Sequence, residues 1–316
     1  MLRLSRPAMG TRFEFLLCGE DVAYLQSAAE EALDEVERLD QQLSLFVPTS
    51  DICAINARAA GEPVRVERRL FALLERALLL SRQSEGAFDI AVLALTRLWK
   101  AGKQPDEGEL AAAWACSGSR HVMLDREQST IRFRRAGVGL DLGAIGKGYA
   151  LEVAAELLWE KGITNALLHG GWSSVYALGA APGKHCWPVA ITHPLDAQRR
   201  LAVVELKDCA LGISANTYQQ FEDDGRRWGH ILDPRTGQPA EGLLAAGISA
   251  SAAKADALST AFFVLGKEGA QQLCASRPNM GAVCVAEGAQ GGEPQISTFG
   301  MAERIVRFAS EVKPDE

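Results

Sequence analysis

The glycine-rich stretch Gly139–Ala150, which reads Gly-Leu-Asp-Leu-Gly-Ala-Ile-Gly-Lys-Gly-Tyr-Ala, constrains the fold of this chain more than any other segment. Residues 131–134 before it alternate apolar and charged side chains, as a half-buried strand does. Residues 149–161 after it place Ala, Leu and Val at helical spacing, with glutamates on the opposite side. We therefore expect a strand, a glycine-rich loop and a helix in this order.

This loop predicts an anion-binding site. Free backbone N–H groups and the positive end of the helix dipole both favour a bound anion. Lys147 adds a cation, and Asp141 adds a carboxylate that can accept from a sugar hydroxyl or a ring N–H. The glycine spacing differs from the dinucleotide-binding fingerprint and from the Walker A loop. The alternative is a tight structural connection in which Lys147 is solvated.

Charge and cysteine content exclude several classes of function. The formal net charge of −7 argues against a nucleic-acid partner, because phosphate binding needs a basic face. No segment approaches the roughly 20 apolar residues of a membrane span. The N-terminal residues lack the apolar core of a signal peptide, and no cysteine follows them as a lipid-attachment site. Seven dispersed cysteines without a C-x-x-C pair predict reduced core thiols in a cytoplasmic protein.

Hydrophobic periodicity predicts the remaining architecture. Amphipathic patterns predict helices over residues 21–43, 67–83, 90–99 and 252–266. Strands are expected near residues 10, 131, 165, 189, 203, 230 and 246. Together these elements predict one α+β domain over residues 1–302, in which a mostly antiparallel sheet is covered by amphipathic helices. A charged tail is expected over residues 303–316.

Two polar segments are candidates for chemistry. In residues 230–237, His230, Asp233 and Arg235 supply a base, a carboxylate and a guanidinium, which suit phosphate or nucleotide chemistry. The alternative is a structural turn in which Asp233 caps the backbone and Arg235 pairs with it. The preceding Asp223-Asp224-Gly225 predicts a hairpin turn.

On the last predicted helix, Asp256 and Thr260 stand four residues apart and share one face. A buried polar pair costs several kcal/mol unless it is satisfied. Coordination of a hard cation or one mutual hydrogen bond would satisfy it. Asp89 poses a similar choice, because it is expected either to cap the helix over 90–99 or to bind a ligand.

These motifs, in this order, resemble the FAD:protein FMN transferase (ApbE-like flavin transferase) family over nearly the whole chain. The resemblance implies a T-fold-like α+β architecture and a Mg²⁺-dependent enzyme. Such an enzyme splits the FAD pyrophosphate, releases AMP and passes FMN through its phosphate to a threonine or serine hydroxyl of a partner flavoprotein. The matching segments are Met9-Gly10-Thr11, 44–56, 86–89, 141–149, Gly170-Gly171, 230–237 and 255–260.

The resemblance also implies roles for individual residues. Asp256, Thr260 and the backbone carbonyl of Ala144 would hold the metal. His230 is the first candidate for a general base or for orienting the phosphate. FAD is expected between the 139–150 turn and the helix bearing Asp256. The residues implied to line the FAD site are Met9, Phe46, Ala87, Phe88, Asp89, Asp141, Lys147 and Leu232.

Two features depart from the family pattern. The usual Ser-Gly-x-Tyr segment appears as residues 214–218, Ser-Ala-Asn-Thr-Tyr, with one extra residue and Ala215 in place of glycine. Ala215 narrows the site if the backbone there must approach the cofactor closely. Many relatives are exported and lipid-anchored, and the lack of both signals favours a cytoplasmic client.

The alternative functions are an FAD-binding or carrier protein without transfer, and an FAD pyrophosphatase that releases FMN and AMP.

Overall fold

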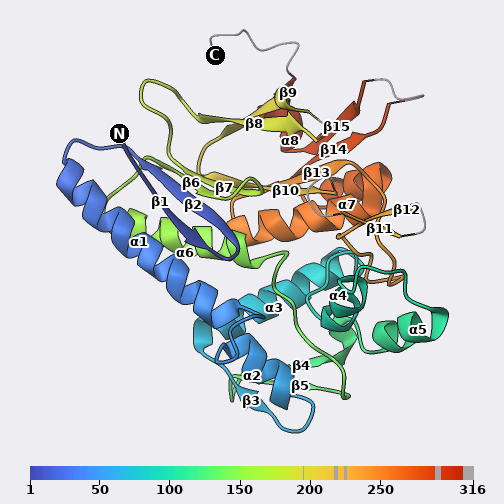
Figure 1. Ribbon diagram of the computed structural model, residues 1–316. Helices are drawn as coiled ribbons and strands as arrows, with labels where there is room; N and C mark the ends of the chain where they lie inside the picture. Colours follow the sequence, from blue (N-terminus) through green and yellow to red (C-terminus); the bar gives the residue numbers. More distant parts are fainter. Residues whose placement is uncertain (195, 217–219, 224–225, 289–292, 309–316) are drawn as a thin grey trace. The chain divides into compact units, whose positions relative to one another are not determined.

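The computed structural model describes residues 1–194, 196–216, 220–223, 226–288 and 293–308 (Figure 1). Contacts group the chain into two compact units. The first is formed from Met1–Leu39, Lys147–Thr217 and Gly242–Glu316, and the second from Asp40–Gly146 and Tyr218–Glu241. The single-domain interpretation of residues 1–302 stays a prediction.

The first unit contains an eight-stranded sheet in which every neighbouring pair is antiparallel. Its first hairpin shows why the segment is a strand, because Phe13, Phe15 and Leu17 are buried and alternate with more exposed residues. In spatial order the strands are β1 (Leu2–Ala8), β2 (Thr11–Leu17), β6 (Ala166–Gly170), β7 (Ser174–Leu178), β10 (Cys209–Ala215), β13 (Leu244–Ser249), β14 (Gly281–Ala286) and β15 (Gln295–Gly300).

A smaller sheet covers one face of the large sheet. It is formed by β16 (Val306–Phe308), β9 (Asp196–Leu206) and β8 (Trp187–His193). Ile191 and Val204 of this sheet share a hydrophobic cluster with Leu211 and Ile248 of the large sheet. Because β16 pairs with β9, regular structure continues beyond the predicted start of the tail at residue 303. Residues 309–316 of that tail lie outside the described residues.

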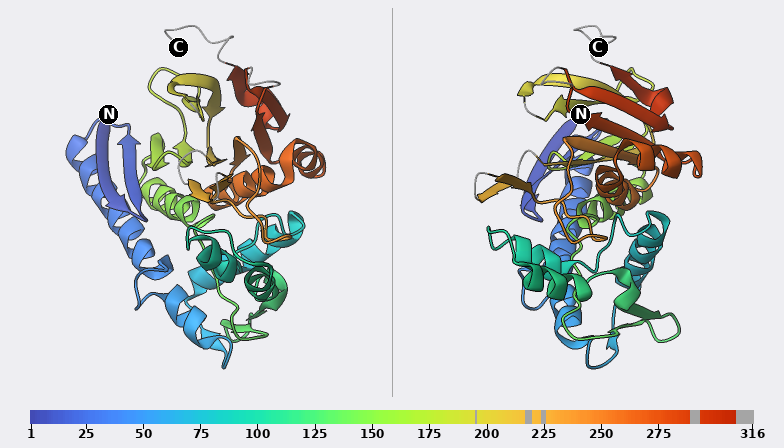
Figure 2. Two further views of the ribbon diagram at one scale, coloured as in Figure 1. Left: turned by 45° about the vertical axis from the view of Figure 1, so that its right-hand side comes forward. Right: turned by 90° about the vertical axis from the view of Figure 1, so that its right-hand side faces the viewer.

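Helices α6 (Gly146–Glu160) and α7 (Ala252–Ala275) lie on the opposite face of the large sheet (Figures 1 and 2). Gly212 of β10 and Gly247 of β13 let α7 approach, since a Cβ on either would lie 2.5 Å from the carbonyl oxygen of Ala255. These glycines alternate with Leu211 and Ile248, which face the smaller sheet. The helix predicted over 252–266 breaks at Gly266, where φ is +68°, and a second helical segment follows it.

The N-terminal hairpin is followed by α1 (Val22–Leu43), which confirms the helix predicted over residues 21–43. A short helix, α8 (Ala302–Ile305), precedes β16. Among the described residues, no helix combines the length and the apolar character that crossing a membrane requires. The strands and helices confirm an α+β fold with mostly antiparallel sheets.

The second unit is mainly helical. Side-chain caps fix the starts of two of its helices, because Ser50 accepts from the N–H of Cys53 and Glu67 accepts from two N–H groups of the next helix. The elements are α2 (Asp51–Arg58), α3 (Arg68–Gln83), α4 (Leu93–Trp99), α5 (Glu107–Ala115), a 3₁₀ turn (Ser119–His121), the sheet β3 (Val64–Arg65), β5 (Thr130–Phe133) and β4 (Val122–Asp125), and the hairpin β11 (Gln220–Asp223) and β12 (Arg226–Gly229).

Two details differ from the sequence-based expectation. Helix α4 begins at Leu93, later than predicted, and its N-cap is Val92, so Asp89 is not the helix cap. The strand expected just before the glycine-rich stretch is β5, which ends at Phe133, so a longer connection leads to α6.

The predicted hairpin turn includes Asp224 and Gly225, which lie outside the described residues, but the flanking strands pair antiparallel.

Candidate functional site

Asp256 of α7 is a buried carboxylate held by two segments far from it in sequence. Its Oδ2 accepts from the backbone N–H of Gly148 at 2.7 Å and from the hydroxyl of Ser174 at 2.9 Å. Only 6% of Asp256 and 1% of Ser174 is exposed. Both hydrogen bonds end on Oδ2, so Oδ1 takes part in neither. The two bonds therefore fix the orientation of the carboxylate.

Gly148 makes this arrangement possible. A Cβ at this position would lie 2.2 Å from the carbonyl oxygen of Ala252 and 2.9 Å from Cγ of Asp256. Any other residue would separate α6 from α7 and remove a donor from the carboxylate. The glycine-rich stretch thus has a packing role in addition to the anion-binding role that its sequence predicts.

Burial and neighbouring groups act in opposite directions on the charge of Asp256. Burial raises the pKa of Asp256 to about 6, while the charge of Lys147 and the hydrogen bonds from Ser174 and Gly148 oppose this shift. A carboxylate with this pKa is mostly ionised at neutral pH, although its surroundings disfavour the charge. A bound cation would compensate for that cost.

A chain of three hydroxyl groups lies next to Asp256. The hydroxyl of Ser259 donates to the backbone carbonyl of Asp256 at 2.7 Å. The hydroxyl of Ser214, on β10, lies 2.8 Å from that of Ser259 and 3.2 Å from that of Thr260. In the described part of the chain, Asp256 and Thr260 have separate partners and are not hydrogen-bonded to each other, so the mutual bond considered from the sequence is wrong.

The loop that precedes α6 belongs to the second unit and is held by hydrogen bonds from Asp141 and from Asn56 of α2. Oδ1 of Asp141 accepts from the N–H of Gly143 at 2.9 Å. The Asn56 side chain binds both backbone groups of Leu140, donating to its carbonyl at 3.0 Å and accepting from its N–H at 2.7 Å. The sequence did not indicate this role of Asn56. The carbonyl of Ala144 as a metal ligand stays a prediction.

Asp89 is a buried carboxylate that joins three segments of the second unit through hydrogen bonds. Its Oδ2 accepts from the hydroxyl of Ser81 and the N–H of Ser119, and its Oδ1 accepts from the N–H of Ala91 and the hydroxyl of Ser119. Four donors fill the acceptor positions of one carboxylate. The neighbouring side chains of Ala87 and Phe88 are buried in the core. For all three residues, lining of the FAD site stays a prediction, and the observed contacts of Asp89 are structural.

We expect Asp89→Asn to lower the free energy of unfolding by about 1–2 kcal/mol, because an amide N–H₂ would then face two donors. Urea unfolding followed by circular dichroism measures this loss. Asp125→Asn is the matched control, since Asp125 is exposed and also accepts from two backbone N–H groups. An equal loss in both variants would contradict the role of Asp89.

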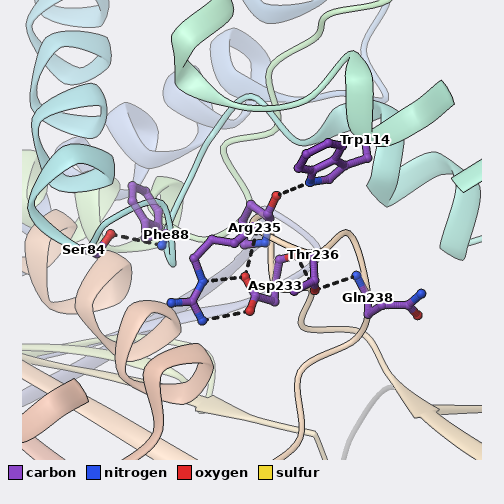
Figure 3. Close-up of polar contacts among 8 residues, drawn as sticks. Ser84, Phe88, Trp114, Asp233, Arg235, Thr236 and Gln238 are labelled. Atoms are coloured by element: carbon purple, nitrogen blue, oxygen red, sulfur yellow. Dashed lines mark hydrogen bonds and ion pairs between the residues drawn. The ribbon is translucent and has the colours of Figure 1, made fainter. Parts of the chain in front are cut away.

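The segment at 233–237 forms a compact turn (Figure 3). Oδ1 of Asp233 accepts from the backbone N–H and from Nε of Arg235, both at 2.9 Å, and Oδ2 accepts from Nη2 at 2.9 Å. The indoles of Trp99 and Trp114 donate to the carbonyls of Gly237 and Pro234, respectively. The structural turn considered from the sequence is therefore confirmed.

We expect Arg235→Ala to lower the free energy of unfolding by at most about 1 kcal/mol, because the ion pair is partly exposed. Asp233→Ala is expected to cost more, since it also removes the acceptor for a backbone N–H. Chemical denaturation of both variants tests this order. A more than tenfold loss of activity in Arg235→Ala at unchanged stability would instead indicate that the guanidinium binds substrate.

The other residues predicted to line the FAD site differ in exposure. Met9 has a φ of +50° in the turn between β1 and β2, and Phe46 is 85% exposed. Leu232 pairs with Pro239 through an isolated bridge. The side chain of His230 is exposed. Met9 and Lys147 belong to the first unit and the others to the second, and their roles stay predictions.

The family segment at 214–218 is only partly described. Residues 214 and 215 end β10, and Ala215 pairs with Leu244 of β13. Ala215 is therefore a ladder residue of the large sheet. Thr217 and Tyr218 lie outside the described residues.

Mostly antiparallel sheets packed with helices place this chain among the α+β proteins, with a buried carboxylate and hydroxyl groups on α7. Within that class, the chain belongs to the ApbE family, whose sequence model matches residues 9–284.

Individual relatives agree with this assignment. The FAD:protein FMN transferase of Treponema pallidum (strain Nichols) is 35% identical over 284 residues, covering 83% of this chain and 78% of that protein. The solved ApbE protein of Thermotoga maritima superposes with a TM-score of 0.84 at 28% identity, covering 94% of this chain and 96% of that one. For the flavin transferase ApbE of Vibrio cholerae, the TM-score is 0.82 at 26% identity, with coverages of 96% and 98%.

Proposed function

We propose that this chain transfers FMN from FAD to a threonine or serine hydroxyl of a partner flavoprotein in a Mg²⁺-dependent reaction that releases AMP. Membership of the ApbE family and similarity to FAD:protein FMN transferases identify it as a flavin transferase. The metal, the acceptor residue and the leaving group are parts of the proposal.

One observation carries the metal assignment. Asp256 and Thr260 stand one turn apart on α7, and both hydrogen bonds to the Asp256 carboxylate end on Oδ2. A carboxylate oxygen and a hydroxyl oxygen are the hard donors that Mg²⁺ prefers, and the ion commonly keeps water and substrate phosphates as further ligands. We propose that Asp256, Thr260 and the carbonyl of Ala144 hold it.

The chemistry requires charge stabilisation more than covalent help from the protein. When bound, Mg²⁺ would neutralise the negative charge that develops on the transferring phosphoryl group. Lys147 lies in the first turn of α6, and its positive charge acts on Asp256. The acceptor oxygen forms a bond to the FMN phosphorus, and the bond from that phosphorus to the AMP oxygen breaks. The acceptor hydroxyl loses its proton, and we propose His230 as the group that takes it.

Intact-mass spectrometry of a candidate acceptor flavoprotein tests this function. After incubation with the chain, FAD and Mg²⁺, the acceptor is expected to gain the mass of FMN at one threonine or serine. Free FMN without an acceptor adduct would indicate a pyrophosphatase. Tight FAD binding without either product would indicate a carrier protein.

The proposal also includes the cellular location of the chain and its partner protein. All seven cysteines are free, and four of them are buried, which supports a reducing compartment. Cytoplasmic location, and the expectation that no nucleic acid is bound, stay predictions. The acceptor is a protein whose flavin-bearing hydroxyl must be reachable from the site.

A further inference from the structure

The hydroxyl chain next to Asp256 has a direction that the heavy-atom positions determine. It runs from Thr260 through Ser214 to Ser259 and ends on the backbone carbonyl of Asp256. A carbonyl oxygen can only accept, so Ser259 must donate its single proton there. Ser259 therefore accepts from Ser214. Because the only O–H of Ser214 then donates to Ser259, Ser214 must accept from Thr260.

This order fixes where the Thr260 proton points. The hydroxyl of Thr260 donates toward β10, and its lone pairs are left for another ligand. Metal coordination by a neutral hydroxyl requires this arrangement, because the cation must meet a lone pair and not the O–H hydrogen. If Thr260 accepted from Ser214 instead, its own proton would be free to point at the cation.

We propose that Ser214 is a positioning residue that orients the Thr260 hydroxyl for the divalent cation, and that Ser259 sets the polarity of the chain. This inference rests on the proposed function, since it assumes that Asp256 and Thr260 hold the metal. The inference extends the proposed metal site by Ser214 and Ser259, which are not hydrogen-bonded to the carboxylate of Asp256. Ser174 and Gly148 orient that carboxylate, and the serine chain orients the hydroxyl beside it.

A purely structural role of Ser214 would affect stability and not cation binding. The Ser214–Thr260 contact also connects β10 to α7, and loss of this connection alone would lower stability without changing the affinity for a cation. Ser276 provides a matched comparison on the same helix, because its hydroxyl donates to the carbonyl of Leu273 at the C-terminal end of α7. Ser276→Ala removes this bond and the acceptor for Nη1 of Arg277, and it leaves the proposed chain intact.

The test is Mn²⁺ binding to the FAD-free protein, followed through the electron paramagnetic resonance signal of the free ion. Ser214→Ala and Ser259→Ala are expected to weaken binding by roughly three- to tenfold, the equivalent of one net hydrogen bond. Ser214→Thr keeps the hydroxyl and is expected to restore binding. Ser276→Ala is expected to bind as the wild type does.

Steady-state kinetics gives a second readout. In Ser214→Ala, the Mg²⁺ concentration for half-maximal rate is expected to rise by the same factor, while the rate at saturating Mg²⁺ stays within about twofold of wild type. Unchanged Mn²⁺ affinity in Ser214→Ala, with weakened binding in Asp256→Asn, would overturn the positioning role alone. Unchanged Mn²⁺ affinity in Asp256→Asn would overturn the metal site of the proposed function itself.

Discussion

Asp256→Asn is expected to reduce flavin transfer by about a hundredfold or more, because the charge that would bind the divalent cation is lost. The asparagine carbonyl can still accept from the N–H of Gly148 and the hydroxyl of Ser174, so the helix packing is expected to remain. Initial rates of acceptor flavinylation, measured beside the circular dichroism spectrum, separate these two effects.

The stability of the wild type relative to this variant is expected to depend on pH. Burial raises the pKa of Asp256 to about 6, so the folded apoprotein favours the protonated form. A raised pKa lowers the free energy of unfolding as pH increases toward and through the folded-state value. In EDTA, wild type should therefore lose stability relative to Asp256→Asn between about pH 4 and pH 7, and Mg²⁺ should restore it at the higher pH.

Urea unfolding at the two pH values, with EDTA or with Mg²⁺, measures this difference. A parallel pH dependence of both proteins in EDTA would contradict the assignment of the titration to Asp256. Full activity in Asp256→Asn would contradict its role in the reaction.

Gly148→Ala is expected to lower the free energy of unfolding by about 3 kcal/mol or more, because the added methyl group meets a backbone carbonyl that cannot move away alone. The Cβ would lie 2.2 Å from the carbonyl oxygen of Ala252, and the displaced helix would also lose the hydrogen bond to Asp256. Urea unfolding of the metal-free protein measures the loss.

Gly146→Ala is the control, two residues earlier in the same helix. A Cβ there meets only Cδ1 of Leu43 at 3.9 Å, an ordinary contact. This variant is expected to be neutral or to gain up to about 1 kcal/mol, since alanine favours the helix and restricts the unfolded chain. Equal stability of the two variants would contradict the close-packing argument.

Local patterns in the sequence predicted much of the fold. The 3.6-residue periodicity located α1 and α3, and alternation located β2, whose inward residues are Phe13, Phe15 and Leu17. The turn at Asp233 could also be foreseen, because its hydrogen bonds to Arg235 span only two residues.

Other elements could not be predicted because their environment is not local. The strand β10 packs against α7 on one side and the smaller sheet on the other, so Cys-Ala-Leu-Gly-Ile-Ser-Ala shows no alternation. Asp89 looked like a helix cap, but its partners include Ser119, which is thirty residues away.

The same limit applies to the candidate site. Helical spacing brought Asp256 and Thr260 onto one face, and the family resemblance suggested a metal. Ser174, which orients the carboxylate, is 82 residues from Asp256 and carried no signal of its own. Ser214 was noticed for the altered residue that follows it, whereas its contact with Thr260 depends on strand pairing in the large sheet.

The most direct test of the proposed reaction is to quantify AMP and acceptor-bound FMN in one incubation with FAD, Mg²⁺ and the acceptor flavoprotein. Transfer predicts one AMP for each modified hydroxyl, with both products lost in EDTA and in Asp256→Asn. AMP formation without acceptor modification, or an undiminished adduct in EDTA, would contradict it.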